Sequence, residues 1–105
     1  MTKLAFLGAG NIAQAIIGGL IATGFNPDDI CAADPSDEQL TKLRKIGVRT
    51  SSENLEAITA AEVVILSIKP DVVEQISREI SPMTSGKLFI SVAAGITATS
   101  LESWL

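Results

Sequence analysis

The stretch Leu7–Gly19, LGAGNIAQAIIGG, decides the fold, because it joins a glycine-rich loop to the start of a helix. It follows the apolar segment Lys3–Leu7 (KLAFL), which is typical of a buried β-strand. After the loop, apolar side chains recur at helical spacing over Asn11–Thr23, and Gly24 is a common kind of helix end. A strand, a tight loop and a helix are therefore expected in succession at the start of the chain.

The rest of the chain repeats this alternation of apolar strands and helical patterns. Strands are expected at Ile30–Ala33, 48–50, Glu62–Ile68 and Leu88–Val92, and helices at 36–46, 52–60, from Pro70, and from Thr99. Strands that alternate with helices are joined by right-handed crossovers and form a parallel sheet. The sequence therefore predicts a single α/β domain over residues 1–105: a Rossmann-like, doubly wound parallel sheet with helices on both faces.

Local signals refine three of these helices. In the first helix, apolar positions such as Ile12, Ile16 and Leu20 are expected to face the core, and Gly18 and Gly19 are expected to mark close packing. In the second, Ser36 and Gln39 form the pattern of a reciprocal capping box, and Leu40, Leu43 and Ile46 supply its apolar face. In the fourth, Val72, Val73, Ile76 and Ile80 are expected to be buried.

Composition excludes several classes of function. The 105 residues carry a net charge of −4, and the only basic cluster, Lys42 to Lys45, has no aromatic neighbours, which argues against nucleic acid as a partner. With one cysteine and no histidine, the chain offers no internal disulfide, no zinc ligand set and no histidine-based nucleophilic catalysis. Cys31, in an apolar run, is expected to be a small buried side chain.

The distribution of apolar residues also bears on location. No apolar run reaches the roughly 18 residues that span a membrane. The first residues lack the layout of a signal peptide, because glycines and Asn11 interrupt the apolar segment. The expectation is a cytoplasmic protein with no membrane partner.

The glycine loop fits the G-x-G-x-x-A form of the dinucleotide-binding fingerprint in its proper strand–loop–helix context. Gly8 allows a tight turn, Gly10 lets the backbone approach a pyrophosphate, and Ala13 lets the helix pack close to the strand. The N–H groups at Asn11 and Ile12 would face the anion at the helix start. The alternative is a tight strand–helix turn that binds nothing.

Asp34 stands at the end of the second strand, where the fingerprint expects an acidic residue. A carboxylate there would accept hydrogen bonds from the adenosine ribose hydroxyls and repel a 2′-phosphate, which favours NAD. Ser36 could donate a hydrogen bond to a phosphate, which leaves NADP open. The alternative is a solvated turn residue in the sequence Asp-Pro-Ser.

Two further strand ends lie near the expected ligand crevice. The run SIKP, Ser67–Pro70, ends the fourth strand beside the first, and Lys69 could meet a phosphate or ribose. The small residues of SVAAGIT, Ser91–Thr97, leave room for a flat ring such as nicotinamide. The alternatives are a solvated lysine and simple close packing.

Three segments together resemble the N-terminal domain of pyrroline-5-carboxylate reductases across the whole chain: FLGAGNIAQAIIGGL, AEVVILSIKP, and ISVAAGIT with the tail SLESWL. The resemblance implies an NAD(P)H-dependent oxidoreductase that reduces 1-pyrroline-5-carboxylate to L-proline in proline biosynthesis. It implies that the pyrophosphate is bound by Leu7, Gly8, Ala9, Gly10, Asn11 and Ile12. It implies that the adenosine ribose is faced by Asp34, Pro35, Ser36 and Asn54. It also implies that the path to the nicotinamide is lined by Ser67, Ile68, Lys69, Pro70, Ala93 and Ala94.

One departure concerns the choice of cofactor. Many relatives carry an arginine next to the position of Asp34, or a neutral residue at it, whereas here Pro35 follows Asp34. The choice between NADPH and NADH therefore stays open.

The resemblance also implies that a helical second domain, which would bind the cyclic imino acid and form the homo-oligomer, lies outside this chain. No catalytic or metal-binding residue is expected within residues 1–105, and the piece alone should not turn over substrate. The alternatives are another oxidoreductase of the hydroxyacid or phosphogluconate dehydrogenase type, and a module that senses nicotinamide redox state without catalysis.

Overall fold

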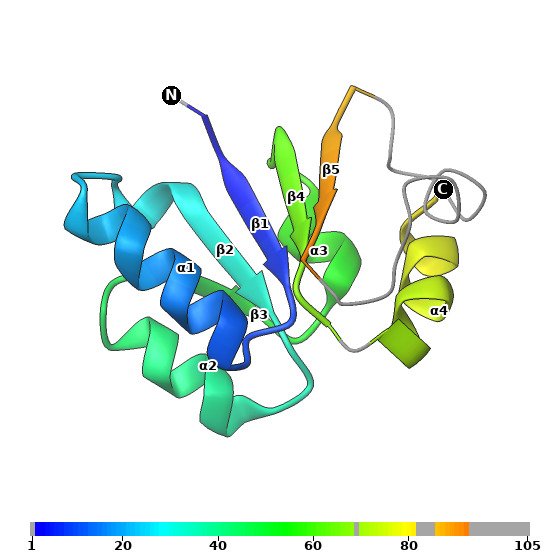
Figure 1. Cartoon of the computed structure of the whole chain (residues 1–105), viewed down its shortest axis with the longest axis horizontal. Coiled ribbons are helices and arrows are strands. Elements are labelled where there is room, and N and C mark those ends of the chain that lie inside the picture. The colour runs from blue at the N-terminus through cyan, green and yellow to red at the C-terminus, as the bar shows by residue number, and fades with distance from the viewer. Residues whose placement is uncertain (1, 69, 82–85, 93–105) are drawn as a thin grey trace.

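A five-stranded parallel sheet is the centre of the fold in the computed structural model, which describes residues 2–68, 70–81 and 86–92 (Figure 1). The strands run in the order β3-β2-β1-β4-β5. They are β1 Leu4–Leu7, β2 Ile30–Ala33, β3 Arg49–Ser51, β4 Val63–Leu66 and β5 Leu88–Ser91. The helices are α1 Asn11–Ala22, α2 Asp37–Arg44, α3 Asn54–Ile58 and α4 Pro70–Ile80, with a short 3₁₀ turn, η1, at Pro27–Asp29.

The strand order places a topological switch beside β1. From β1 the chain moves outward in one direction to β2 and β3, and then returns to the other side of β1 for β4 and β5. The register sets Leu7 level with Ala33 on one side and with Leu66 on the other, so the carboxyl ends of these strands share one edge. This is the edge at which doubly wound sheets bind ligands. The predicted fold class is confirmed.

Helices cover the sheet on two faces, each with its own apolar cluster. On one face α1 and α2 pack through Ile17 and Leu43 against Phe6 and its neighbours, and Figure 1 shows α1 in front of β2 with α2 below it. On the other face α3 and α4 pack through Ile58 and Ile80 around alternate strand residues such as Leu7, Val64 and Leu66. The alternation of side chains along β1 therefore supplies both layers of the core.

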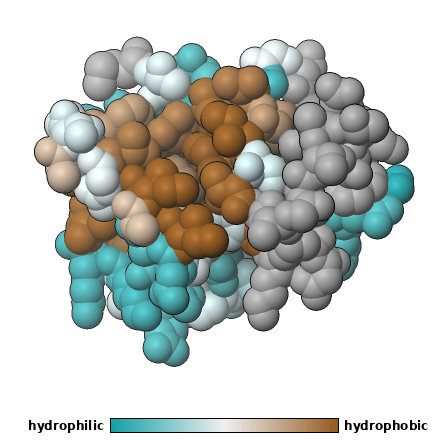
Figure 2. Space-filling view, in the orientation of Figure 1, coloured by the Kyte–Doolittle hydropathy of each residue, from teal (hydrophilic) through white to brown (hydrophobic). Residues whose placement is uncertain are grey.

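The outer strand β5 is only partly covered. Leu88 and Ile90 pair with Val63 and Ile65, so they lie on the same face as α1, and they remain 60% and 43% exposed. Figure 2 shows an extended apolar surface on this side of the molecule. Among the described residues, β5 is therefore apolar as expected, but its face toward α1 is not covered by a helix.

The buried side of α1 is the expected one at Ile16 and Leu20, which pack against the cluster around Phe6, but not at Ile12. Ala13 and Ile17 are fully buried, whereas Ile12 is 55% exposed. Gly18 and Gly19 are exposed, and a Cβ built on either meets no atom of the described residues within 4 Å. The prediction that these glycines mark close packing is wrong, because the helix turns them away from the sheet.

The remaining differences lie at the ends of elements. The first helix ends at Ala22, and β3, α3, β4 and β5 are shifted or shortened by one to two residues at an end. Ile46 is exposed because α2 ends at Arg44 and the chain then turns through Gly47, whose φ is +91°. The side chains of Val72 and Val73 and the helix expected from Thr99 lie outside the described residues.

Candidate functional site

The first glycine of the loop is fixed in place by its backbone and its neighbours. Gly8 has φ +104°, and its N–H donates a 2.8 Å hydrogen bond to the carbonyl of Ala33 at the end of β2. A Cβ at this position would lie 2.7 Å from Cγ2 of Ile68 and closer still to the carbonyl oxygen of Ser67. The tight turn therefore requires glycine, as the fingerprint predicts.

Ser67 ties the end of β4 to the glycine loop. Its backbone N–H donates to the carbonyl of Leu7 at 2.9 Å, and its Oγ donates to the carbonyls of Gly8 at 2.9 Å and Leu7 at 3.2 Å. The half-buried hydroxyl thus holds the loop at the switch point from the neighbouring strand. This structural contact was not part of the sequence prediction, which placed Ser67 on the path to the nicotinamide.

The start of α1 is open to a ligand. Gly10 is the N-cap, and none of the side chains that the structure describes caps the helix there. A Cβ on Gly10 would meet no atom of the described residues within 4 Å, so packing among them does not require a glycine at this position. Asn11 and Ile12 are exposed, whereas Ala9 and Ala13 are fully buried. An uncapped helix start with a bare backbone fits a phosphate.

Asp34 reaches into the glycine loop. Its Oδ2 accepts a 2.8 Å hydrogen bond from the N–H of Ala9, and its Oδ1 accepts one of 2.8 Å from the N–H of Ser36. The carboxylate is therefore anchored between two segments: its bond to Ser36 belongs to the turn that the alternative describes, and its bond to Ala9 goes beyond that turn. The exposed Pro35 lies between these two anchoring residues. Whether Asp34 also meets a ribose stays a prediction.

The capping box at α2 forms in one direction only. The hydroxyl of Ser36 accepts from the N–H of Gln39 at 3.4 Å, as predicted. The reciprocal bond is absent, because the N–H of Ser36 donates to Asp34. The side chain of Gln39 instead accepts a 2.7 Å hydrogen bond from Nε2 of Gln14. Gln14 also donates to the carbonyl of Ala9 at 2.8 Å, a contact that the sequence motifs do not indicate.

The other predicted site residues are placed less completely. Asn54 is the first residue of α3 rather than its cap, and its Nδ2 donates to Oε2 of Glu79 at 3.4 Å. Ile68 is half-buried against the cluster under α3 and α4, and Pro70 begins α4. Lys69, Ala93 and Ala94 lie outside the described residues.

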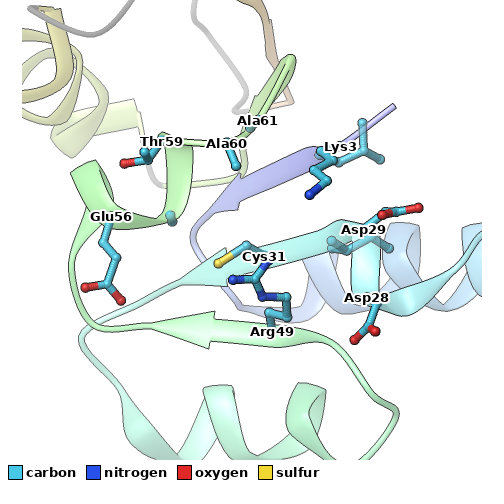
Figure 3. A pocket seen from close by; sticks show the side chains of 12 residues that line it. Lys3, Asp28, Asp29, Cys31, Arg49, Glu56, Thr59, Ala60 and Ala61 are labelled. Carbon is cyan, nitrogen blue, oxygen red and sulfur yellow. The ribbon is translucent and has the colours of Figure 1, made fainter. Parts of the chain in front are cut away.

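A pocket of about 270 Å³ opens at the opposite edge of the sheet, where the strands begin (Figure 3). Cys31 lines it and is half-buried, so the expectation of a buried thiol holds only in part. Burial raises the pKa of the Cys31 thiol, against a smaller lowering by Arg49. None of the predicted cofactor residues that the structure describes lines this pocket. The described residues contain no group of three potential metal ligands and no helix long and apolar enough to cross a membrane.

The parallel sheet, its switch point and the glycine loop at the carboxyl edge define a Rossmann-type domain carrying the dinucleotide-binding fingerprint. Residues 3–95 match the family described as NADP oxidoreductase, coenzyme F420-dependent, and the chain belongs to this family.

Relatives by sequence include pyrroline-5-carboxylate reductase of Vibrio alginolyticus, which is 40% identical over 98% of this chain and 39% of its own length. Pyrroline-5-carboxylate reductase 3 of Danio rerio is 35% identical over 98% of the chain and 36% of its length. The chain thus spans about two-fifths of the length of these relatives.

Solved structures agree with the sequence relatives. A pyrroline-5-carboxylate reductase from Coxiella burnetii superposes with a TM-score of 0.95 at 36% identity, over 99% of this chain and 40% of that one. The Plasmodium falciparum enzyme, solved with NADP bound, gives 0.86 at 25% identity, over 98% and 37%. The resemblance inferred from the sequence motifs is confirmed.

Proposed function

We propose that this chain is the cofactor-binding part of an NAD(P)H-dependent reductase that converts 1-pyrroline-5-carboxylate to L-proline. The observation that carries the proposal is the open, uncapped start of α1 beside Gly10, held at the switch point by the locked turn at Gly8. The reaction is suggested by the relatives, which are pyrroline-5-carboxylate reductases at up to 40% identity.

The residues present fit a dinucleotide. The N–H groups of Gly8 and Ala9 already donate to Ala33 and Asp34, so the backbone from Gly10 to Ile12 would hold the pyrophosphate. The segment from Asp34 to Ser36, with Asn54, would lie toward the adenosine ribose. When bound, the reduced cofactor supplies the hydride that a C=N bond accepts. The chain's own part is to bind and orient that cofactor at the edge where the strands end.

The remaining functions of the enzyme are assigned to sequence outside the match. We infer that a second, helical domain binds the cyclic imino acid and forms the homo-oligomer, because the relatives are more than twice as long as the matched region. The chain itself supplies no catalytic acid or base in this proposal, and the enzyme would act in the cytoplasm.

A fluorescence titration of the chain with NADH and NADPH, side by side, tests the proposal. Saturable binding of at least one nucleotide is expected, and binding of neither would contradict the cofactor role. A second assay follows proline formation from 1-pyrroline-5-carboxylate. The chain alone is expected to form none, and measurable turnover would overturn the assignment of substrate binding to a second domain.

A second candidate is the reduction or oxidation of a small hydroxyacid. The fold also matches 3-hydroxyisobutyrate dehydrogenase of Mycobacterium tuberculosis with a TM-score of 0.76 at 25% identity, over 99% of this chain and 35% of that one. Joining this chain to the remaining domain of a pyrroline-5-carboxylate reductase discriminates between the two. Turnover of the cyclic imine by that hybrid would favour the reductase.

A further inference from the structure

Five hydrogen bonds form a closed circuit beside the glycine loop. Asp34 accepts from the N–H groups of Ala9 and Ser36, both at 2.8 Å. The Ser36 hydroxyl accepts from the N–H of Gln39 at 3.4 Å, and the Gln39 side chain accepts from Gln14 at 2.7 Å. Gln14 closes the circuit by donating to the carbonyl of Ala9 at 2.8 Å.

The circuit joins two segments that are distant in sequence. Ala9 lies in the loop between β1 and α1, whereas Asp34 and Ser36 lie in the connection from β2 to α2. In the proposed function the first segment meets the pyrophosphate and the second meets the adenosine ribose. A dinucleotide must reach both at once, so their relative position decides how well it binds.

We propose that Gln14 is a positioning residue that holds these two segments in register for the dinucleotide. Its one amide nitrogen carries two hydrogens, and these satisfy the loop carbonyl of Ala9 and the side chain of Gln39 on the neighbouring helix. Gln14 acts through these partners rather than by touching the cofactor. The inference rests on the proposed function.

The chemistry of the position restricts what could replace Gln14. A glutamate in its ionised form only accepts hydrogen bonds, so it would face the Ala9 carbonyl with no hydrogen to offer. A methionine has similar length and good helix propensity but no donor. Gln14→Met therefore removes the two hydrogen bonds with little change in shape or in helix stability.

The test measures dissociation constants for NADPH, NADH and adenosine with Gln14→Met, Gln39→Met and the double variant. The control is Gln75→Met, at an exposed position of α4. Because Gln14→Met removes the hydrogen bonds to Ala9 and Gln39, it should weaken the affinity for whichever of NADPH and NADH binds more tightly by about three- to tenfold. The double variant should be no weaker than Gln14→Met alone, because either change opens the same circuit.

Binding of adenosine separates positioning from general support. Adenosine carries the ribose but no phosphate, so it does not need the two segments in register, and its affinity should stay within about twofold of that for the unaltered chain. Equal losses for adenosine and the dinucleotide, or losses that multiply in the double variant, would overturn the proposal. So would unchanged dinucleotide binding in Gln14→Met.

A readout without nucleotide keeps this inference separate from the proposed function. Gln14→Met should shift the backbone amide resonances of Ala9 and Ser36 in the NMR spectrum, whereas Gln75→Met should not. Unshifted resonances would refute the circuit even if the chain binds dinucleotide. If the resonances shift but the unaltered chain binds neither dinucleotide, the proposed function is refuted and the circuit is not. Gln14 would then have no cofactor to position.

Discussion

Replacing Gly8 by alanine should destabilise the fold, whereas the same change at Gly10 should not. At Gly8 the added methyl group would sit 2.7 Å from Cγ2 of Ile68 and against the carbonyl of Ser67. Ser67 cannot easily retreat, because its N–H and Oγ are both bonded to the backbone of the β1 end. The backbone at φ +104° is also unfavourable for any residue with a Cβ.

The magnitude follows from these two effects. Holding a non-glycine residue at such a φ costs about 1–3 kcal/mol, and forcing a methyl group into occupied space costs about 1–3 kcal/mol. A domain of this size has a free energy of unfolding of about 5–15 kcal/mol, so Gly8→Ala removes a large fraction of it. At Gly10 the φ is −80° and the space is open, and the change in stability should stay within about 1 kcal/mol.

Urea unfolding of the two variants and the unaltered chain provides the assay. Gly8→Ala should lower the midpoint by about 1 M or more, given slopes of about 1–3 kcal/mol per molar for small proteins. Gly10→Ala should unfold close to the unaltered chain yet bind NADH or NADPH at least about fivefold more weakly, because its methyl group occupies the ligand's space. A midpoint for Gly8→Ala equal to that of the unaltered chain would refute the role assigned to Gly8.

Three further predictions concern side chains of the two sheet edges. Asp34→Ala should shift the ratio of NADPH to NADH affinity toward NADPH by about fivefold, because the carboxylate would repel the 2′-phosphate by about 1 kcal/mol per pair of unit charges 4 Å apart in water. Parallel titrations with the two nucleotides check this ratio. An unchanged ratio would mean that the carboxylate does not face the 2′-position. Ser67→Ala, which loses the one hydroxyl hydrogen shared by the carbonyls of Gly8 and Leu7, should lower the free energy of unfolding by about 1 kcal/mol in urea titration. Because burial raises the pKa of Cys31, its alkylation by iodoacetamide should be slower than that of free cysteine at neutral pH. The rate of alkylation should also keep rising with pH above the ordinary thiol pKa. Mass spectrometry of timed samples measures both. Reaction as fast as that of free cysteine would contradict the burial of the thiol.

The fold could be predicted from the sequence because its signals are local. The strand Leu4–Leu7, the loop at Gly8 and the helix from Asn11 follow from apolar spacing and glycine chemistry within a short window. Helix ends and buried faces were predicted less well, since packing against the sheet decides them. The rotation of α1 that buries Ala13 and Ile17 rather than Ile12 depends on strands far along the chain.

The glycine loop was predictable for the same reason, but its supports were not. Gly8 and Gly10 belong to one short motif, whereas the bonds from Ser67 cross 59 and 60 residues of sequence. Asp34 was recognised by its place at the end of β2, yet its contact with Ala9 depends on the register between the strands. Gln14 and Gln39 lie outside the motif positions, and only the packing of two helices on one face brings them together.

The two glycines of the loop have different structural roles. Gly8, pressed against Ser67, fixes where the turn lies. Gly10, where an added Cβ would meet no described atom within 4 Å, leaves the helix start bare. A turn that served packing alone would have no reason to leave Gly10 free and α1 uncapped. The same turn is braced from β4 by Ser67 and from β2 by Asp34, so its amides are held in place before any ligand arrives. Such preorganisation lowers the cost of binding an anion, and it favours a binding site over a simple connection.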